Sequence, residues 1–325
     1  MISVKTPFRI SFFGGGTDFK DYYKAYGGAV LSTTIDKYCY VTLRDMPQFF
    51  ASKNQFTYSK IERFNAPEEV SHPLVRNALK YLPYDHIQIS YDADLPACSG
   101  LGTSSAFAVA LLQGLHAMRG EYLDKENLAR EAVYLERTLC KEAGGVQDQY
   151  ATAFGGLNRF SFSRRGVDAS PVNISALTKT QLEKNLMLVF TGFTRFSDTI
   201  AAENQTNIAR NVATLHQMAA LVDEAQSLLL QGNLDDFGRL LGETWKMKQT
   251  LASNTSNETV NEIYRKALAN GALGGKLLGA GGGGYLLLYV PKQAQAGLRK
   301  ALEPYQFTAF AFENGGTQIA GNTQI

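Results

Sequence analysis

The sequence predicts a mixed α/β fold, of the α/β or α+β class, in two domains. Its 325 residues exceed the usual limit for a single hydrophobic core. The apolar fraction of 45% and the charged fraction of 19% are typical of an ordinary globular protein. Strand-like and helix-like patterns alternate in both halves of the chain. We place the boundary near residue 180, which predicts domains over 1–180 and 181–325.

In the first domain, short β-like runs separated by glycine-rich breaks predict strands joined by tight turns. These runs are 8–13, 29–34 and 38–44. Residues 86–91 alternate apolar with polar and lead through a glycine loop into a helix over 104–119, with Thr103 or Ser104 as its cap. A second amphipathic helix is predicted over 127–141.

The second domain opens on a run of buried-strand character at 186–190. The patterns that follow predict helices over 198–231, 234–252 and 257–270, and a strand over 285–290. Strands and helices therefore alternate here as well, which supports one fold class for both domains.

Charge and cysteine content exclude several classes of function. The net charge is +2 with both signs interspersed, so the chain lacks the basic field that binds nucleic acid. Its three cysteines form no CxxC pair, which suits a reducing compartment, and we expect the cytoplasm. No signal-peptide pattern or run of 18 apolar residues is present, so neither export nor membrane insertion is expected.

Three glycine-bearing segments carry most of the functional information. They are Pro7 to Asp18, Ser99 to Ala106, and Gly279 to Gly284. The middle segment passes from glycine through hydroxyl residues into an apolar helix, so its backbone N–H groups should face a bound anion. Any one cluster alone could be a tight turn, but the three together predict a phosphate-handling enzyme.

Two common nucleotide motifs are excluded. The nearest imitation of the GxxxxGK[ST] loop has Asn270 for the first glycine and Leu277 for the hydroxyl residue. The third cluster satisfies GxGxxG, but a dinucleotide fingerprint follows a strand and opens a helix. Here we expect a helix before the cluster and a strand after it.

The middle segment is similar to the Pro-xxx-Gly-Leu-Gly-Ser-Ser-Ala signature of the GHMP kinase superfamily, the sugar, mevalonate and homoserine kinases. The three segments resemble that superfamily's motifs in order and spacing over almost the whole chain. The resemblance implies a ribosomal-protein-like N-terminal α/β domain that binds ATP and a ferredoxin-like C-terminal domain. It also implies ATP and Mg²⁺ as cofactors, and a homo-oligomer is compatible with it.

The resemblance assigns the nucleotide site to the middle segment, namely Ser99, Gly100, Leu101, Gly102, Thr103, Ser104 and Ser105. Ser104 would bring its hydroxyl to Mg²⁺, with Ser105 as a competitor for that role. Glu136 aligns with the magnesium carboxylate of the superfamily, the alternative being a solvated glutamate beside Arg137.

Phosphoryl transfer also needs a carboxylate for the attacking hydroxyl and a cation for the developing charge. The resemblance assigns these catalytic roles to Asp148 and Arg9; the alternatives are a turn aspartate and an exposed strand arginine. Asp18, with Thr17 and Gly16, would meet the sugar hydroxyls, although Asp18 could instead be an Asx-turn residue.

Gly15 and Gly16 stand where galactokinases carry Glu and His, and the loss of those side chains is expected to open room at one end of the sugar. Within the superfamily this pattern most resembles the D-glycero-D-manno-heptose 7-phosphate kinases. The resemblance implies transfer of the ATP γ-phosphate to the anomeric hydroxyl of the sugar. The product would be a 1,7-bisphosphate for nucleotide-activated heptose synthesis. Arg195 is our candidate for the substrate's own phosphate, with Lys20, Lys37, Arg164 and Lys246 as alternatives. An L-fucokinase or other sugar 1-kinase, and a non-catalytic ATP and sugar sensor, remain alternative functions.

Overall fold

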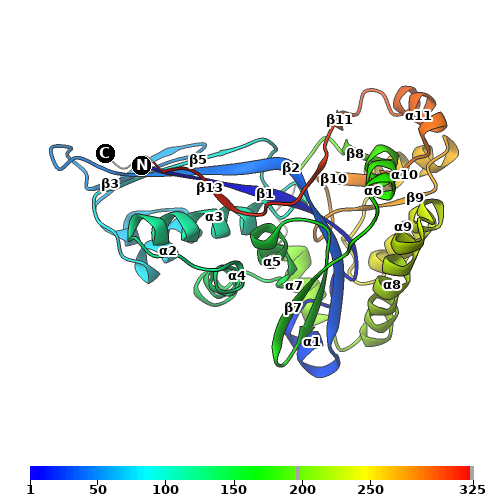
Figure 1. Ribbon diagram of the computed structural model, residues 1–325, viewed down its shortest axis with the longest axis horizontal. Helices are drawn as coiled ribbons and strands as arrows, with labels where there is room; N and C mark the ends of the chain where they lie inside the picture. Colours follow the sequence, from blue (N-terminus) through cyan, green and yellow to red (C-terminus); the bar gives the residue numbers. More distant parts are fainter. Residues whose placement is uncertain (195–197, 323–325) are drawn as a thin grey trace.

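The computed structural model describes residues 1–194 and 198–322, which form two β-sheets with helices packed against each of them (Figure 1). The larger sheet is built mostly from the first half of the chain and the smaller one from the second half. This arrangement confirms the predicted mixed α/β class.

The larger sheet has nine strands within the described ranges. They are β1 (Ile2–Phe13), β2 (Gly28–Asp45), β3 (Asn54–Thr57), β4 (Ile61–Phe64), β5 (Ile87–Ala93), β6 (Asn158–Ser163), β7 (Gly166–Pro171), β12 (Phe312–Glu313) and β13 (Gln318–Asn322). The order along its main path is β13-β1-β2-β5-β3-β4, and β2 also pairs with β6 and β12. The predicted strands at 29–34 and 38–44 are one continuous strand, β2.

The centre of this sheet is the antiparallel pair β1 and β2. Their register shifts between Pro7 and Phe8, because proline has no N–H to donate to the ladder. Beyond that shift, residues 8–13 of β1 are all buried. The strand thus carries Arg9 into the interior and delivers the first glycine segment at its end.

Helices of the first half are α1 (Lys20–Tyr26), η1 (Pro67–Glu69), α2 (Pro73–Tyr81), α3 (Thr103–Met118), α4 (Lys125–Val133), the π-helical segment η2 (Tyr134–Leu139) and α5 (Gln147–Phe154). Figure 1 shows α2, α3, α4 and α5 on the same face of the sheet. The apolar helix α3 packs directly on β1 and β2, and Gly114 lets it approach Leu43 closely.

The smaller sheet has the order β11-β8-β10-β9 and is antiparallel throughout. Its strands are β8 (Leu186–Phe190), β9 (Gly274–Leu277), β10 (Tyr285–Tyr289) and β11 (Phe307–Thr308). The helices of this half are α6 (Ala176–Asn185), α7 (Asp198–Thr206), α8 (Val212–Gln231), α9 (Leu234–Gln249), α10 (Glu258–Ala269), η3 (Lys292–Ala294) and α11 (Gln295–Ala301).

Two expectations about these elements were wrong, and a third was right except for its bounds. The predicted helix over 198–231 is two helices, α7 and α8, with turns over 207–211 between them. The helix predicted over 127–141 is present as α4, which begins at Lys125, and the π-helical turn η2, which ends at Leu139. The third glycine cluster joins strands β9 and β10 rather than following a helix directly, although it does open a strand as expected.

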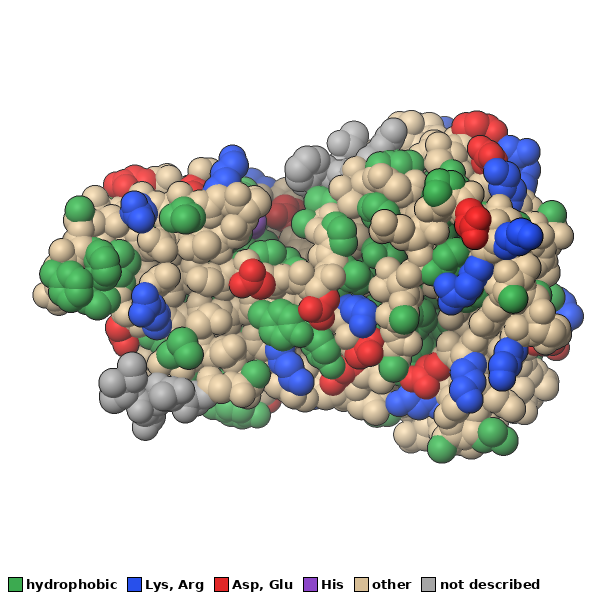
Figure 2. All heavy atoms as spheres, turned by 90° about the horizontal axis from the view of Figure 1, so that it is seen from above, with side chains coloured by type: hydrophobic (Ala, Val, Ile, Leu, Met, Phe, Trp, Pro, Cys, Tyr) green, Lys and Arg blue, Asp and Glu red, His purple; other side chains and the backbone are tan. Residues whose placement is uncertain are grey.

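Strands β12 and β13 lie near the end of the chain but belong to the first sheet. The change from the first sheet to the second falls at β8, close to the predicted boundary at residue 180, which stays a prediction. Between the two parts the surface is hollowed (Figure 2). Among the described residues, no helix combines the length and the apolar character needed to cross a membrane.

Candidate active site

The site begins with an ion pair between β1 and α5. The guanidinium of Arg9 donates from Nε and Nη2 to the two carboxylate oxygens of Asp148, both at 2.8 Å. Its Nη1 donates to the carbonyl oxygen of Gly100 at 2.7 Å. Arg9 is only 3% exposed, whereas the side chain of Asp148 keeps 24% of its surface. One buried cation therefore connects the first motif, the middle loop and an accessible carboxylate.

The middle loop is held by its backbone and leaves a helix end open. Gly102, with a φ of 72°, is the residue that precedes α3, and no side chain caps the free N–H groups of the first turn. The predicted cap by Thr103 or Ser104 is therefore wrong. Free N–H groups and the positive end of the helix dipole favour a bound anion at this point.

The remaining residues of this loop are divided between the interior and the site. Leu101 and Ser105 are buried, while Ser104 is exposed. Ser99 is fully buried and its Oγ has no hydrogen-bond partner among the described residues. The backbone N–H of Arg9 donates to the carbonyl of Leu101 at 2.9 Å, which fixes the loop to β1.

Ser104 and Glu136 meet, as the magnesium assignment requires. The hydroxyl of Ser104 donates to Oε1 of Glu136 at 3.1 Å, and the amide of Gln149 donates to Oε2. Glu136 lies in the π-helical turn and is 1% exposed, so it is no solvated surface glutamate. Such π-turns frequently occur at functional sites. Of the two serines considered, Ser104 is the one that contacts this carboxylate.

This pair fits the ligand chemistry of Mg²⁺. The ion prefers oxygen donors and commonly takes one or two carboxylates together with phosphates and water. The buried Oε1 of Gln149, beside Glu136, has no hydrogen-bond partner among the described residues. Over the same residues, no group of three or more His, Cys, Asp and Glu side chains could hold a metal by itself. A bound ion would thus depend on the nucleotide for further ligands.

The first glycine segment is tied to α5 through Asp18. This buried carboxylate accepts the backbone N–H of Gly16 at 3.0 Å and that of Gln147 at 3.1 Å. Burial, and then the charge of Asp148, raise the pKa of Asp18. The Thr17 hydroxyl is also buried and donates to the carbonyls of Gly14 and Ala29. Both residues therefore hold the segment together, and their roles toward a substrate stay predictions.

Three buried polar atoms beside the first segment have no partner among the described residues. A Cβ added at Gly15 would lie 3.7 Å from Nε2 of Gln147 and 3.9 Å from Oγ of Ser11. The free atoms are Oε1 of Gln147, Oγ of Ser11 and Oδ1 of Asn204. Unpaired buried polar atoms are costly, so they mark positions where a ligand with hydroxyl groups would be favoured.

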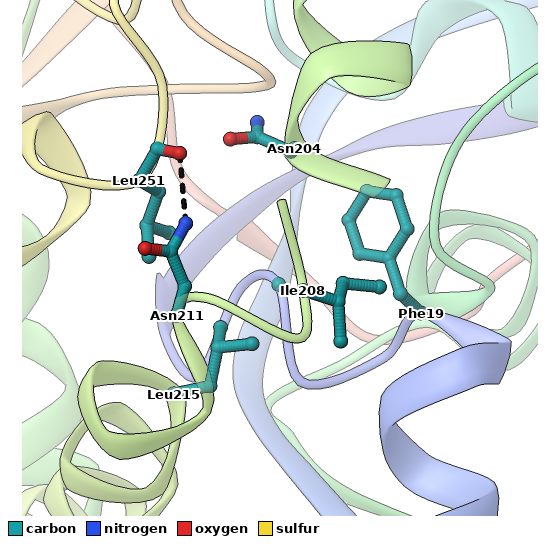
Figure 3. Close-up of a pocket in the computed structure, with 7 residues that line it drawn as sticks. Phe19, Asn204, Ile208, Asn211, Leu215 and Leu251 are labelled. Atoms are coloured by element: carbon teal, nitrogen blue, oxygen red, sulfur yellow. Dashed lines mark hydrogen bonds between the residues drawn. The ribbon is translucent and has the colours of Figure 1, made fainter. Parts of the chain in front are cut away.

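Asn204 lies at a small cavity of about 10 Å³ beside Gly16 (Figure 3). The lining side chains come from both halves of the chain: Phe19, Asn204, Ile208, Asn211, Leu215 and Leu251. The amide of Asn211 donates to the carbonyl of Leu251 at 2.9 Å, and the Asn204 amide lies above this pair in Figure 3. The cavity is too small for a sugar, but it shows that α7 and α8 border the first motif.

The third glycine cluster packs against the middle loop through Gly279 and Gly284. A Cβ added at Gly279 would lie 2.6 Å from Cα of Gly100, and one at Gly284 would lie 2.3 Å from the carbonyl oxygen of Ser99. Both glycines have positive φ, +71° and +101°. Only glycine permits this approach of the two loops.

Of the candidates for a second phosphate site, Arg195 lies outside the described residues. Lys20 and Lys246 are exposed, Lys37 pairs with Asp36, and Arg164 donates to the carbonyl of Lys24. The sequence did not predict two lysines that lie near Arg9. They are Lys248 of α9 and Lys276 of β9. The sequence offered one signal for them, a lysine within the apolar run at 272–278. That signal indicates a buried Lys276 and gives no indication of Lys248.

Comparison with known proteins identifies two domain families. Residues 72–156 match the GHMP kinases N terminal domain, and residues 225–306 match the GHMP kinases C terminal domain. A D-glycero-alpha-D-manno-heptose 7-phosphate kinase from Campylobacter jejuni is 29% identical over 320 residues, which cover 94% of each chain. A bifunctional fucokinase/GDP-fucose pyrophosphorylase from Arabidopsis thaliana is 28% identical over 93% of this chain and 31% of its own length.

Among solved structures, a D-glycero-D-manno-heptose 1-phosphate kinase from Bacteroides thetaiotaomicron superimposes with a TM-score of 0.80. The match covers 98% of each chain at 24% sequence identity, a level at which the likeness concerns the fold. This likeness agrees with the predicted fold class, while the division into domains over 1–180 and 181–325 stays a prediction.

Proposed function

This chain belongs to the GHMP kinase family as a sugar kinase, a phosphotransferase with an alcohol group as acceptor, and we propose that it uses ATP to phosphorylate D-glycero-D-manno-heptose 7-phosphate at its anomeric hydroxyl. The product would be the 1,7-bisphosphate, an intermediate for nucleotide-activated heptose. The observation that carries the proposal is the accessible Asp148 carboxylate, paired with buried Arg9 beside the open N-terminus of α3.

In this proposal the nucleotide phosphates lie against residues 99–105. The uncapped N–H groups of α3 donate to phosphate oxygens, and the helix dipole adds to their attraction. Ser104 and Glu136 would hold Mg²⁺, which when bound neutralises charge on the phosphates. Arg9 stabilises the charge of the transferred phosphoryl group through its cationic guanidinium.

Asp148 accepts a hydrogen bond from the sugar hydroxyl and orients it toward the phosphoryl group. The transition state of phosphoryl transfer is loose, so positioning contributes more than proton removal. The double hydrogen bond from Arg9 fixes the plane of the carboxylate. Thr152 donates to the carbonyl of Asp148 at 2.9 Å and steadies the first turn of α5.

The sugar would lie beside the first glycine segment, with Asp18, Thr17 and Gly16. Support comes from the unpartnered atoms of Ser11, Gln147 and Asn204, which offer hydrogen bonds to a substrate rich in hydroxyl groups. The missing side chain at Gly15, where a Cβ would meet nothing nearer than 3.7 Å, leaves room for a longer sugar, whereas Gly14 and Gly16 pack closely against Ala29 and Leu215. We propose Arg195 for the substrate's own phosphate, and a cytoplasmic location in view of three free cysteines.

A second candidate acceptor is a heptose 1-phosphate, since the superimposed Bacteroides thetaiotaomicron protein is a heptose 1-phosphate kinase. A third is an unphosphorylated sugar such as L-fucose, since a fucokinase is among the relatives. A sensor that binds ATP and sugar without turnover is disfavoured, because all four residues proposed for catalysis and metal binding are present. They form two hydrogen-bonded pairs, Arg9 with Asp148 and Ser104 with Glu136.

The test is ADP release with Mg-ATP against a panel of sugars. The panel contains the heptose 7-phosphate, the heptose 1-phosphate, mannose 6-phosphate, fucose, galactose and mannose, with Asp148→Asn as the inactive control. Turnover with the 7-phosphate alone is the expected result. Turnover with another member would replace the substrate while leaving the kinase chemistry intact, and binding without any ADP release would support the sensor.

A further inference from the structure

Two lysines from the second half of the chain lie next to the pair of Arg9 and Asp148. Nζ of Lys248, on α9, donates to the carbonyl of Leu277 at 2.9 Å and to that of Gly279 at 2.5 Å. Nζ of Lys276, on β9, donates to the carbonyl of Phe12 in β1 at 2.8 Å. The second half thus brings two amines to the place where the first and third glycine segments meet the middle loop.

Neither lysine has a hydrogen-bond acceptor for each of its N–H groups. An ammonium group has three N–H donors. Lys248 uses two of them and also lies 5.8 Å from the ring centroid of Trp245, while Lys276 uses one, although Lys276 is only 3% exposed. Over the described residues no carboxylate forms an ion pair with either lysine, and the nearby Asp148 is already bound by Arg9. The cluster therefore has more cationic groups than anionic partners.

The ionisation of both amines reflects this imbalance. Burial and the charge of Arg9 lower the pKa of Lys248 to about 7, against a smaller opposing effect of Asp148. Burial lowers the pKa of Lys276 well below its usual range, and the charges of Lys248 and Arg9 lower it further. The charged groups that face Lys248 are thus Arg9 from β1, Asp148 from α5 and Lys276 from β9. An anion at this place would relieve the repulsion and supply the missing acceptors.

The contacts of Lys248 indicate which anion this is. Its acceptor Gly279 packs against Gly100, whose carbonyl binds Arg9. Lys248 is half-buried as a residue, and one of its three N–H groups has no acceptor among the described residues. We propose that Lys248 is a further catalytic residue, which binds an oxygen of the terminal phosphate of the nucleoside triphosphate from the side opposite α3. Lys276 is a positioning residue, which joins β9 to β1 behind it. This inference rests on the proposed kinase function.

A binding experiment separates this role from a purely structural one. The affinities of the full chain for Mg·AMP-PNP and Mg·ADP are measured by calorimetry, for the wild type and for Lys248→Met. The matched control is Arg239→Met, which removes an exposed basic side chain from the same helix. The expected loss for Lys248→Met is roughly 10- to 100-fold for AMP-PNP, as for one hydrogen bond from a charged group, with ADP binding unchanged. Lys248→Arg should restore most of it.

Proton uptake gives an independent readout. Because the pKa of Lys248 is about 7 in the free protein, an anion beside it should draw a proton onto the amine at pH 8. Calorimetry in buffers of different ionisation enthalpy should show more proton uptake for the wild type than for Lys248→Met with AMP-PNP, and no difference with ADP.

Four results would overturn the inference. Equal losses for AMP-PNP and ADP would mean that Lys248 only fastens the third glycine loop, and unchanged affinities would mean that it contacts no phosphate. If the wild type bound neither nucleotide, the proposed function would fail and the inference with it. If the wild type phosphorylated a sugar while Lys248→Met bound AMP-PNP normally, the inference alone would fail.

Discussion

The contact between Gly279 and Gly100 offers the sharpest test of how the site is assembled. Replacing Gly279 by alanine would place a Cβ 2.6 Å from Cα of Gly100, whereas ordinary contacts begin at 3.4 Å. The two loops would have to separate by about 0.8 Å. Both sides are backbone, so no side chain can move aside. The carbonyl of Gly100 binds Arg9, and the displacement would be transmitted to the pair of Arg9 and Asp148.

A misplacement of this size costs roughly 100-fold in kcat/KM. Alanine at a φ of +71° adds backbone strain of about 1–2 kcal/mol, and the steric overlap adds about 1–3 kcal/mol more. Gly120 is the matched control, because its φ is +73° and a Cβ there would meet nothing within 4 Å. Gly120→Ala therefore has the same strain without the collision.

The test measures ADP release and thermal unfolding for both variants. Gly120→Ala should lose about 1–2 kcal/mol of stability and no activity. Gly279→Ala should lose more stability and most of its activity. Equal effects of the two substitutions would refute the argument, since they would show that the close approach of the loops contributes nothing beyond the conformation of a single glycine.

Four further outcomes are expected. Asp148→Asn should lower turnover by roughly two to four decades with little change in ATP affinity, and normal turnover would remove Asp148 from its role. Glu136→Gln should raise the Mg²⁺ concentration needed for nucleotide binding about tenfold, measured by titration with Mg²⁺. Gln147→Ala should raise KM for the sugar about tenfold and leave KM for ATP unchanged in steady-state kinetics. Between pH 7 and 10 the folded chain releases the Lys248 proton before the unfolded chain does, since the pKa is lowered from 10.5 to about 7. Thermal scans should therefore show the wild type gaining stability over Lys248→Met across this range; a constant difference would contradict the lowered pKa.

Local patterns predicted most of the secondary structure. The run at 186–190 is strand β8 with the same bounds, and the helix predicted over 257–270 is α10, Glu258–Ala269, with Asn257 as its cap. The long helix over 198–231 was predicted wrongly because apolar periodicity continues across residues 207–211. The break falls where the side chain of Asn211 donates to the carbonyl of Leu251, a contact between distant segments that no local pattern encodes.

For the site, the motifs predicted residues that the structure brings together, while their roles in catalysis and metal binding stay predictions. The pairs of Arg9 with Asp148 and of Ser104 with Glu136 join segments far apart in sequence, and the motifs brought them together correctly. Lys248 could not be predicted, because a lysine near the end of an amphipathic helix is normally solvated. Only the packing of α9 against β9 carries this amine toward Arg9.

The return of β12 and β13 to the first sheet has a consequence for the order in which the protein folds. Strand β13 pairs with residues 2–5 of β1, and β12 pairs with β2. During synthesis from the N-terminus, the edge of β1 and part of β2 must wait unpaired until residues 312–322 have left the ribosome. Exposed strand edges of this kind attract other nascent chains. Chaperone demand, and the loss of yield when residues 312–322 are removed, should therefore be greater than the small size of the two strands suggests.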